Sequence, residues 1–185
     1  MTDLFATRDR RAGRATRGNV NVRSGVRSAG AALGAVLAGL LVAAGPALAE
    51  DPVLSLHHSD GDVIELSMSD LTRLGLHRMD TANEFVGDDK VTFEGVLGRD
   101  VLALFEAAPD ATYRFVASND YAVEIPAGDF DTWDVLLAMS QDGTPFSARD
   151  KGPLWVVYPQ SDHPELQDVL YNSRMIWQLV RIEAQ

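Results

Sequence analysis

The first group of side chains that could do chemistry in this 185-residue chain is the pair His57-His58, followed by Asp60 and Asp62. Imidazole and carboxylate groups are ligands for transition metals. Adjacent residues of a β-strand point to opposite faces, however, so the two histidines do not converge on one ion. We interpret this group as a polar hairpin tip and predict no metal site there.

Two further histidines lie close to an aspartate, His77 before Asp80 and His163 after Asp162. Each pair has the residue types of an acid–base pair. Such pairs are common on protein surfaces, and no serine is spaced from either histidine in a way that marks a nucleophile. The chain has no cysteine and no phosphate-loop, dinucleotide, zinc-protease or nucleophile-elbow pattern. Neither the two histidine–aspartate pairs nor these motifs therefore identify a catalytic residue.

The third group combines positive charge with hydrogen-bonding side chains and is the candidate ligand-binding site. Its members are Asn119, Tyr121, Arg149, Lys151 and Arg174. Guanidinium and ammonium groups recognise anions, and Gly152 would let a ligand approach the backbone closely. The group predicts a site for a small anionic ligand. The alternative is that these bases only balance a very acidic surface.

The first 49 residues have the pattern of an export signal. Seven arginines against two acids precede the apolar run AGAALGAVLAGLLVAAG, which is followed by Ala47-Leu48-Ala49. A basic segment, an apolar core and a small-x-small site predict a signal peptide over residues 1–49, cleaved after Ala49. The run is shorter and less apolar than the roughly 20 residues of a membrane span, which favours a signal over an anchor. Arg10-Arg11 leaves both the general and the twin-arginine export routes open.

Residues 50–185 are expected to form a single periplasmic domain. That compartment permits disulfides, but without cysteine the domain must rely on its packed core. Removing the two acids and seven arginines of residues 1–49 leaves 25 acids and nine bases, a net charge of −16. Such a charge repels nucleic acid and anionic lipid. We expect no nucleic-acid partner and no stable membrane insertion after cleavage. The expected partner is a small anionic ligand or a periplasmic or membrane protein.

The elements that must position these residues follow from periodicity and turn residues. Strands are expected at 53–56, 63–66, 91–93, 113–117, 123–125, 152–159 and 175–184. Helices are expected at 69–76 with a cap at Ser67 or Ser69, at 98–108 before Pro109, at 129–139 as a short helix or helix–strand hybrid, and from Asp162 onward. Strands outnumber helices without regular alternation, which predicts an α+β fold.

Four stretches occur in a recognisable order: VTFEGVLGRDVLALF, YRFVASNDYAVEIP, LLAMSQDGTPFSARDKGPLWVVYP and SRMIWQLVRIEA. Together they resemble the molybdopterin-binding domain of the sulfite oxidase family, and most closely its small, single-domain, exported bacterial members. The resemblance extends from Val53 to Ala184. Its most specific pieces are Phe93-x-Gly95, Ser118-Asn119-Asp120-Tyr121, Asp142-Gly143-x-Pro145, Gly152-Pro153-Leu154, Pro159 and Ile176-Trp177. It implies mixed β-sheets with short helices around a pterin-sized cleft.

The chain departs from this family at the metal site. In catalytic members, the resemblance implies, a cysteine before the Phe-x-Gly corner ligates molybdenum, whereas Thr81–Phe85 here reads Thr-Ala-Asn-Glu-Phe. A thiolate is a soft ligand, and Glu84 would be a hard oxygen ligand. The family also places basic residues where this chain has Trp155 and Ile176. Arg174 lies two positions from the second of these, and the sequence leaves open whether it substitutes.

We therefore expect an exported, non-catalytic ligand-binding or accessory domain that keeps the fold, with the segment from Thr81 to Phe105 as a mobile, solvated lip of the pocket. No cofactor is expected, although the resemblance implies molybdopterin. The alternative is a molybdopterin-dependent oxidoreductase with atypical metal ligation, through Glu84 or without any protein ligand. A third reading is a module that docks a membrane sensor or redox partner.

Overall fold

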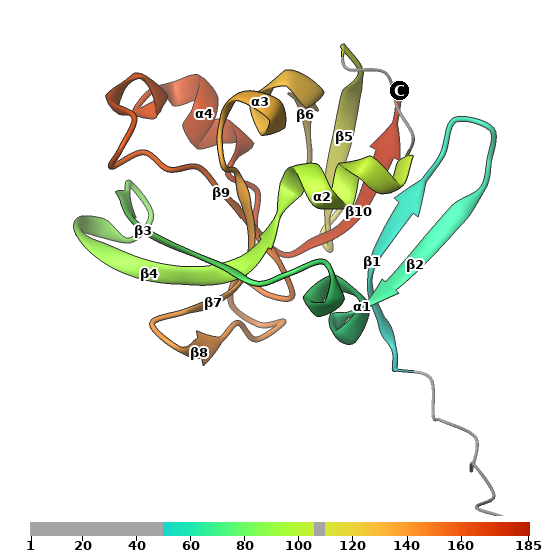
Figure 1. Cartoon of the computed structure of the whole chain (residues 1–185), viewed down its shortest axis with the longest axis horizontal. Coiled ribbons are helices and arrows are strands. Elements are labelled where there is room, and N and C mark those ends of the chain that lie inside the picture. Colours follow the sequence, from blue (N-terminus) through green and yellow to red (C-terminus); the bar gives the residue numbers. More distant parts are fainter. Residues whose placement is uncertain (1–49, 106–109) are drawn as a thin grey trace, which may run out of the picture. The chain divides into compact units, whose positions relative to one another are not determined.

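Two five-stranded β-sheets and a few short helices make up the part of the chain that the structure, a computed structural model, describes: residues 50–105 and 110–185 (Figure 1). The predicted signal peptide and the end of the predicted helix before Pro109 lie outside these residues. Within the described ranges, no helix has the length and apolar character needed to cross a membrane. The mixed architecture of sheets and short helices confirms the predicted α+β class.

The first sheet has the strand order β2-β1-β10-β5-β6. Its strands are β1 (Pro52–His57), β2 (Val63–Ser67), β5 (Thr112–Ala117), β6 (Ala122–Pro126) and β10 (Leu179–Ala184). β1 and β10 pair in parallel, and the other neighbours are antiparallel. Alternate apolar residues, among them Leu54, Leu56, Tyr113 and Phe115, are buried, because every second side chain of a strand faces the same side.

The second sheet has the order β3-β4-β7-β8, with β9 also paired to β7, and all its pairings are antiparallel. Its strands are β3 (His77–Asn83), β4 (Gly87–Leu97), β7 (Leu136–Gln141), β8 (Thr144–Pro145) and β9 (Trp155–Val157). β4 and β7 approach closely at Gly95, where an added Cβ would lie 2.1 Å from the Leu137 carbonyl oxygen. The glycine of the Phe-x-Gly corner is therefore required by strand packing.

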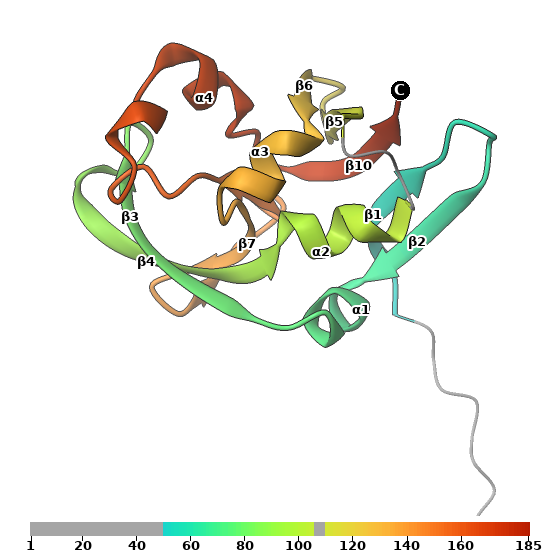
Figure 2. The same cartoon turned by 45° about the horizontal axis from the view of Figure 1, so that its top comes forward.

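The helices are all short. They are α1 (Met68–Arg73), α2 (Gly98–Leu102), α3 (Ala127–Thr132) and α4 (Val169–Arg174), with 3₁₀ turns at Ala103–Phe105 and Pro164–Leu166. Ser67 is the N-cap of α1 and forms a capping box with Asp70, which decides between the two predicted caps. α2 and α3 lie side by side in both views (Figures 1 and 2).

Two predictions near the C-terminus are wrong in their boundaries. The helix expected from Asp162 is a 3₁₀ turn followed by α4, whose N-cap is Asp168, because that carboxylate accepts a hydrogen bond from the Leu170 amide at 2.8 Å. The final strand begins at Leu179 rather than at Met175. Gln178 has a positive φ of 54°, which takes the preceding residues out of the strand. Residues 175–178 instead contribute to the cleft described below.

Candidate functional site

A cleft of about 470 Å³ is bordered by the tip of the β3–β4 hairpin, the β5–β6 turn and α4. The hairpin tip and the α4 region lie near each other in both cartoon views (Figures 1 and 2). The apolar lining residues are Phe85, Ala117, Tyr121, Val169, Met175, Ile176 and Trp177. The polar lining residues are Glu84, Asn119, Asn172, Ser173 and Gln178. Its volume and mostly apolar lining, with a few polar groups, are typical of small-molecule sites.

Aromatic side chains form one wall of the cleft. The Phe85 ring meets the Trp177 ring edge to face at 5.1 Å and the Trp155 ring at 6.1 Å between centroids. Trp155 is fully buried, and its indole N–H donates to the Met175 carbonyl at 3.1 Å. Because Trp155 is held by the core, it fixes the positions of the rings that face the cleft. Trp177 remains 40% exposed.

The β5–β6 turn places Asn119 and Tyr121 at the rim. Asp120 adopts a left-handed conformation with φ 64°, and the Asn119 side-chain oxygen accepts a hydrogen bond from the Tyr121 amide at 3.1 Å. Gln178 ties this turn to the neighbouring loop, since it accepts from the Ser118 hydroxyl at 3.0 Å and donates to the Asp150 carbonyl at 2.8 Å. Tyr121 is 53% exposed at the edge of the cleft.

α4 forms the opposite wall and has no buried residue. It is held by polar side chains: Arg174 Nη1 donates to Asp129 Oδ2 at 2.7 Å, and the Tyr158 hydroxyl donates to the same oxygen at 2.6 Å. Gln160 Nε2 also donates to Asn172 Oδ1 at 2.7 Å. Burial, followed by the hydrogen bond to Asp129, raises the pKa of Tyr158 far above its usual value, so this hydroxyl stays protonated as a donor.

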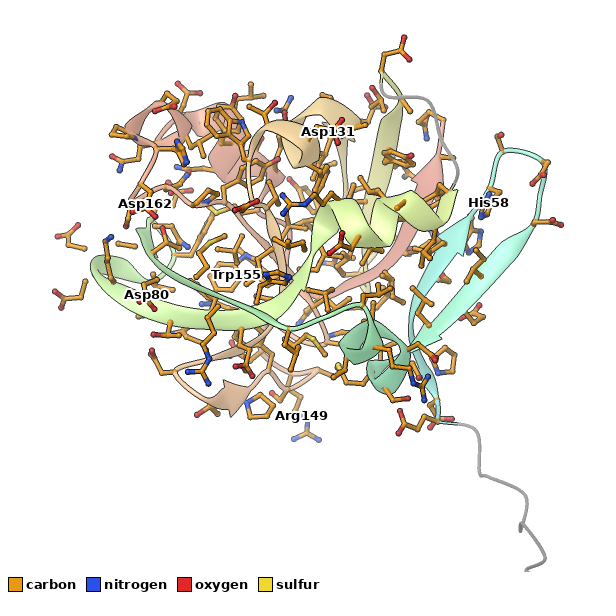
Figure 3. All side chains as sticks on the ribbon, viewed as in Figure 1. His58, Asp80, Asp131, Arg149, Trp155 and Asp162 are labelled. Carbon is orange, nitrogen blue, oxygen red and sulfur yellow. The ribbon has the colours of Figure 1, made fainter. Side chains whose placement is uncertain are left out.

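The structure brings together only two of the five predicted site residues. Asn119 and Tyr121 line the cleft, whereas Arg149, Lys151 and Arg174 do not. Arg149 is exposed and extends away from the fold (Figure 3). The Lys151 ammonium lies 4.3 Å from the centre of the Trp155 ring, and Arg174 is paired with Asp129. Ligand binding by these five residues stays a prediction.

Ion pairs bear out the alternative interpretation of the third group for only one of its three bases, since among the described residues Arg174 pairs with a carboxylate and Arg149 and Lys151 do not. Seven of the nine bases in residues 50–185 form ion pairs with carboxylates, namely Arg73, Arg78, Lys90, Arg99, Arg114, Arg174 and Arg181. Packing within the chain explains why residue 152 is a glycine. A Cβ there would lie 2.8 Å from the Phe146 carbonyl oxygen, so the close approach is made by the chain's own loop and not by a ligand.

The prediction of a solvated, mobile lip is wrong for Thr81–Asn83. Thr81 is fully buried and Asn83 is 6% exposed, and both belong to β3. Thr81 Oγ1 accepts from the Ser161 amide at 3.0 Å, and Ser161 Oγ accepts from the Ala82 amide at 2.8 Å. The buried Thr81 hydroxyl is thus satisfied by a distant loop, whereas Asn83 Oδ1 accepts from the nearby Phe85 amide at 2.9 Å. Only Glu84 and Phe85 reach the cleft.

Three of the histidines contact different side chains. His58 packs against Phe105 at 4.9 Å and His163 against Trp133 at 4.6 Å between ring centroids. His57 Nε2 lies 3.2 Å from Ser55 Oγ in the same strand. Among the described residues there is no group of three or more histidine or carboxylate side chains arranged to hold a metal ion.

The sequence did not mark Phe85, Asn172 or Trp177 as site residues, and it offered Glu84 only as a metal ligand in the alternative function. Trp177 was noted only as part of a family motif. A large apolar side chain that stays exposed often marks a binding surface.

No protein-family model matches the chain, and no curated protein matches it. In structure, the chain is similar to the sulfane dehydrogenase SoxCD from Paracoccus pantotrophus, with a TM-score of 0.50 and 12% sequence identity. The match covers 71% of this chain and 37% of that one, so the chain spans little more than a third of that protein's length. At this identity the likeness shows a distantly shared fold, and it agrees with the sulfite oxidase-like architecture expected from the sequence.

Proposed function

We propose that this chain is an exported, non-catalytic ligand-binding domain on a sulfite oxidase-type fold, with the cleft of Glu84, Phe85, Tyr121 and Trp177 as its site. One observation carries the proposal. In the segment where the family resemblance implies a metal-ligating cysteine, Thr81 is tied to Ser161 and the Phe85 ring packs on Trp155 and Trp177. The segment thus contributes an aromatic wall in place of a metal ligand.

The residues present do not fit molybdopterin. The chain has no thiol, and the one charged side chain among those lining the cleft is the carboxylate of Glu84. The positions at which the family resemblance implies basic residues hold Trp155 and Ile176, which are 0% and 3% exposed. A phosphate would therefore meet no cationic partner in the lining. We assign no reaction step to this cofactor, and the oxidoreductase alternative has no support from these residues.

The chemistry of the cleft favours a ligand with a flat, apolar body. Aromatic rings recognise such a body through stacking and edge-to-face contacts. The side chains of Asn119, Asn172 and Ser173 supply hydrogen-bonding groups at the rim. A small apolar group with one polar end would bury its body against Phe85 and Trp177 and leave that end near the rim.

A protein partner is a second candidate occupant of the cleft. The exposed apolar residues of α4 favour it. Val169 and Leu170, in the first turn of α4, are 81% and 51% exposed. Exposed apolar side chains beside a cleft are a common feature of docking surfaces. An accessory role in the periplasm would use this surface together with the cleft.

Binding of an uncharged aromatic probe tests the proposed site. 2-Naphthylmethanol should bind to the purified domain, measured by titration calorimetry, and Trp177→Ala should weaken its binding about tenfold through the loss of the ring contact. Leu76→Ala is the matched control, because Leu76 is 49% exposed and does not line the cleft. Absence of binding, or equal binding by both variants, would contradict the assignment of the cleft.

Metal and pterin analysis tests the non-catalytic part of the proposal. Protein isolated from its native compartment should contain no stoichiometric molybdenum and release no pterin on extraction. Equimolar molybdenum in that material would establish the oxidoreductase alternative instead.

A further inference from the structure

The charge and the aromatic character of the cleft point to one class of ligand. We infer that the cleft of Glu84, Phe85, Tyr121 and Trp177 binds an organic cation, an amine or quaternary ammonium group attached to an apolar body. This inference rests on the proposed ligand-binding function and specifies its ligand.

The first support is electrostatic. Glu84 is exposed at the tip of the β3–β4 hairpin and makes no ion pair with any described residue. No lysine or arginine of residues 50–105 and 110–185 lines the cleft. The domain as a whole carries a net charge of −16 when residues 1–49 are removed. A cation is therefore attracted at long range and meets a free carboxylate at the site, while an anion is repelled by both.

The second support is the exposure of aromatic rings beside that carboxylate. Tyr121 and Trp177 are 53% and 40% exposed, and Phe85 lies against Trp177. The face of an aromatic ring carries partial negative charge and attracts ammonium groups, most strongly for tryptophan. Aromatic rings next to a carboxylate are thus suited to a cation that is attached to an apolar group.

The third support comes from the aromatic cluster behind the cleft. The Lys151 ammonium lies 4.3 Å from the centre of the Trp155 ring. Trp155 is buried behind the lining and packs near both Phe85 and Trp177. One ring of this cluster therefore already holds a cation of the chain, and Trp177 is its exposed member in the lining.

The relative sizes of the two effects determine what to measure. An ion pair with an exposed carboxylate changes affinity only about two- to fivefold. A cation over an exposed or partly desolvated ring adds about two- to thirtyfold. The aromatic rings should therefore account for more of the preference for a cation than Glu84 does.

Three probes with one ring system test the inference: (2-naphthylmethyl)trimethylammonium, the uncharged 2-naphthylmethanol and the anionic 2-naphthalenesulfonate. The expected order of affinity, by titration calorimetry at low salt, is cation, then neutral, then anion, with the cation about tenfold tighter than the alcohol. At high salt the preference of the cleft for the cation over the alcohol should become smaller but persist, because salt screens only the ionic part of the interaction.

Two variants separate the sources of the preference. Glu84→Gln should weaken binding of the cation two- to fivefold and leave the alcohol unchanged, whereas Glu65→Gln, the same change on an exposed strand residue outside the cleft, should alter neither. Trp177→Leu retains apolar contact but removes the ring face, so it should lower the affinity for the cation more than for the alcohol.

Each outcome has a distinct meaning. Equal affinity for the cation and the alcohol overturns the cation inference and leaves the proposed ligand-binding function intact. Tighter binding of the sulfonate overturns the inference in favour of the anionic ligand that the basic residues had predicted. If none of the three probes binds, the inference and the proposed use of the cleft both fail.

Discussion

The two walls of the cleft are held in place in different ways. The wall formed by Glu84 and Phe85 continues the hydrogen-bonded ladder of β3 and β4 and is backed by the buried Thr81. The wall formed by α4 has no fully buried residue and is held by the polar contacts of Arg174 and Asn172 and by one half-buried tyrosine that packs on the core. A sheet-backed wall keeps its shape, whereas a wall held by a few side-chain anchors opens at a lower cost in free energy. The cleft thus joins a fixed aromatic wall to an adjustable one.

Removal of the main α4 anchor should have the largest effect. Arg174→Ala leaves Asp129, whose side chain is 12% exposed, without its cationic partner. Loss of one member of a nearly buried pair should lower the free energy of unfolding by about 3 kcal/mol in urea titrations. Arg99→Ala removes an ion pair with the exposed Asp134 and should cost less than about 1 kcal/mol. Equal losses in the two variants would show that this pair does not hold α4.

Tyr158→Phe should have the next largest effect. It removes the hydroxyl hydrogen bond to Asp129, which still keeps Arg174, and should cost about 1–2 kcal/mol in the free energy of unfolding. Tyr121→Phe, at an exposed tyrosine, is the control. If Tyr158→Phe lowered Tm no more than this control does, the expected stabilisation by the hydrogen bond would be wrong.

The same tyrosine predicts an alkaline limit to stability. Burial raises the pKa of Tyr158 above its usual value of 10.0 in the folded state, while the unfolded chain titrates normally. The unfolded state alone therefore loses this proton above pH 10, and the free energy of unfolding should fall by about 1.4 kcal/mol per pH unit there. Chemical unfolding at pH 9 to 11 measures this slope, which should be shallower in Tyr158→Phe.

The fixed wall should respond less to a single polar deletion. Thr81→Val keeps the shape of the buried side chain but leaves the Ser161 amide without its acceptor. We expect a loss of about 1 kcal/mol in the free energy of unfolding, with unchanged binding of 2-naphthylmethanol because the β3–β4 ladder still positions Phe85. A loss of probe binding in this variant would show that this wall is adjustable too.

The smallest effect lies away from both walls, on the first sheet. The hydrogen bond from Arg114 lowers the pKa of Glu183, and Arg181 adds to this effect. The stabilisation is present above the unfolded pKa and is lost as pH falls through the folded value, so acid should weaken the domain below about pH 4. Because both side chains are partly exposed, the share of Glu183 should stay below about 1 kcal/mol. Glu183→Gln should flatten the acid limb of the unfolding curve by that amount.

Local patterns predicted much of the fold correctly. The strand–turn–strand unit from Thr112 to Pro126 has the expected alternation, and Asp120 takes the left-handed turn conformation. The buried strand Trp155–Val157 lies within the strand expected at 152–159, and Ser67 was one of the two expected caps. These features depend on residues within one or two turns of each other. The burial of Thr81 was missed because its partner, Ser161, lies 80 residues away in the sequence.

The sequence alone determined the properties that follow from residue types and their order: a mixed α+β pattern, a net negative charge and the absence of any thiol. Tertiary structure decided which side chains meet. It placed Phe85 against Trp177, which lies 92 positions further along the chain, paired Arg174 with Asp129, and kept the predicted bases out of the cleft. Composition and periodicity act locally, whereas a binding site depends on contacts between distant segments that form only when the sheets pack together.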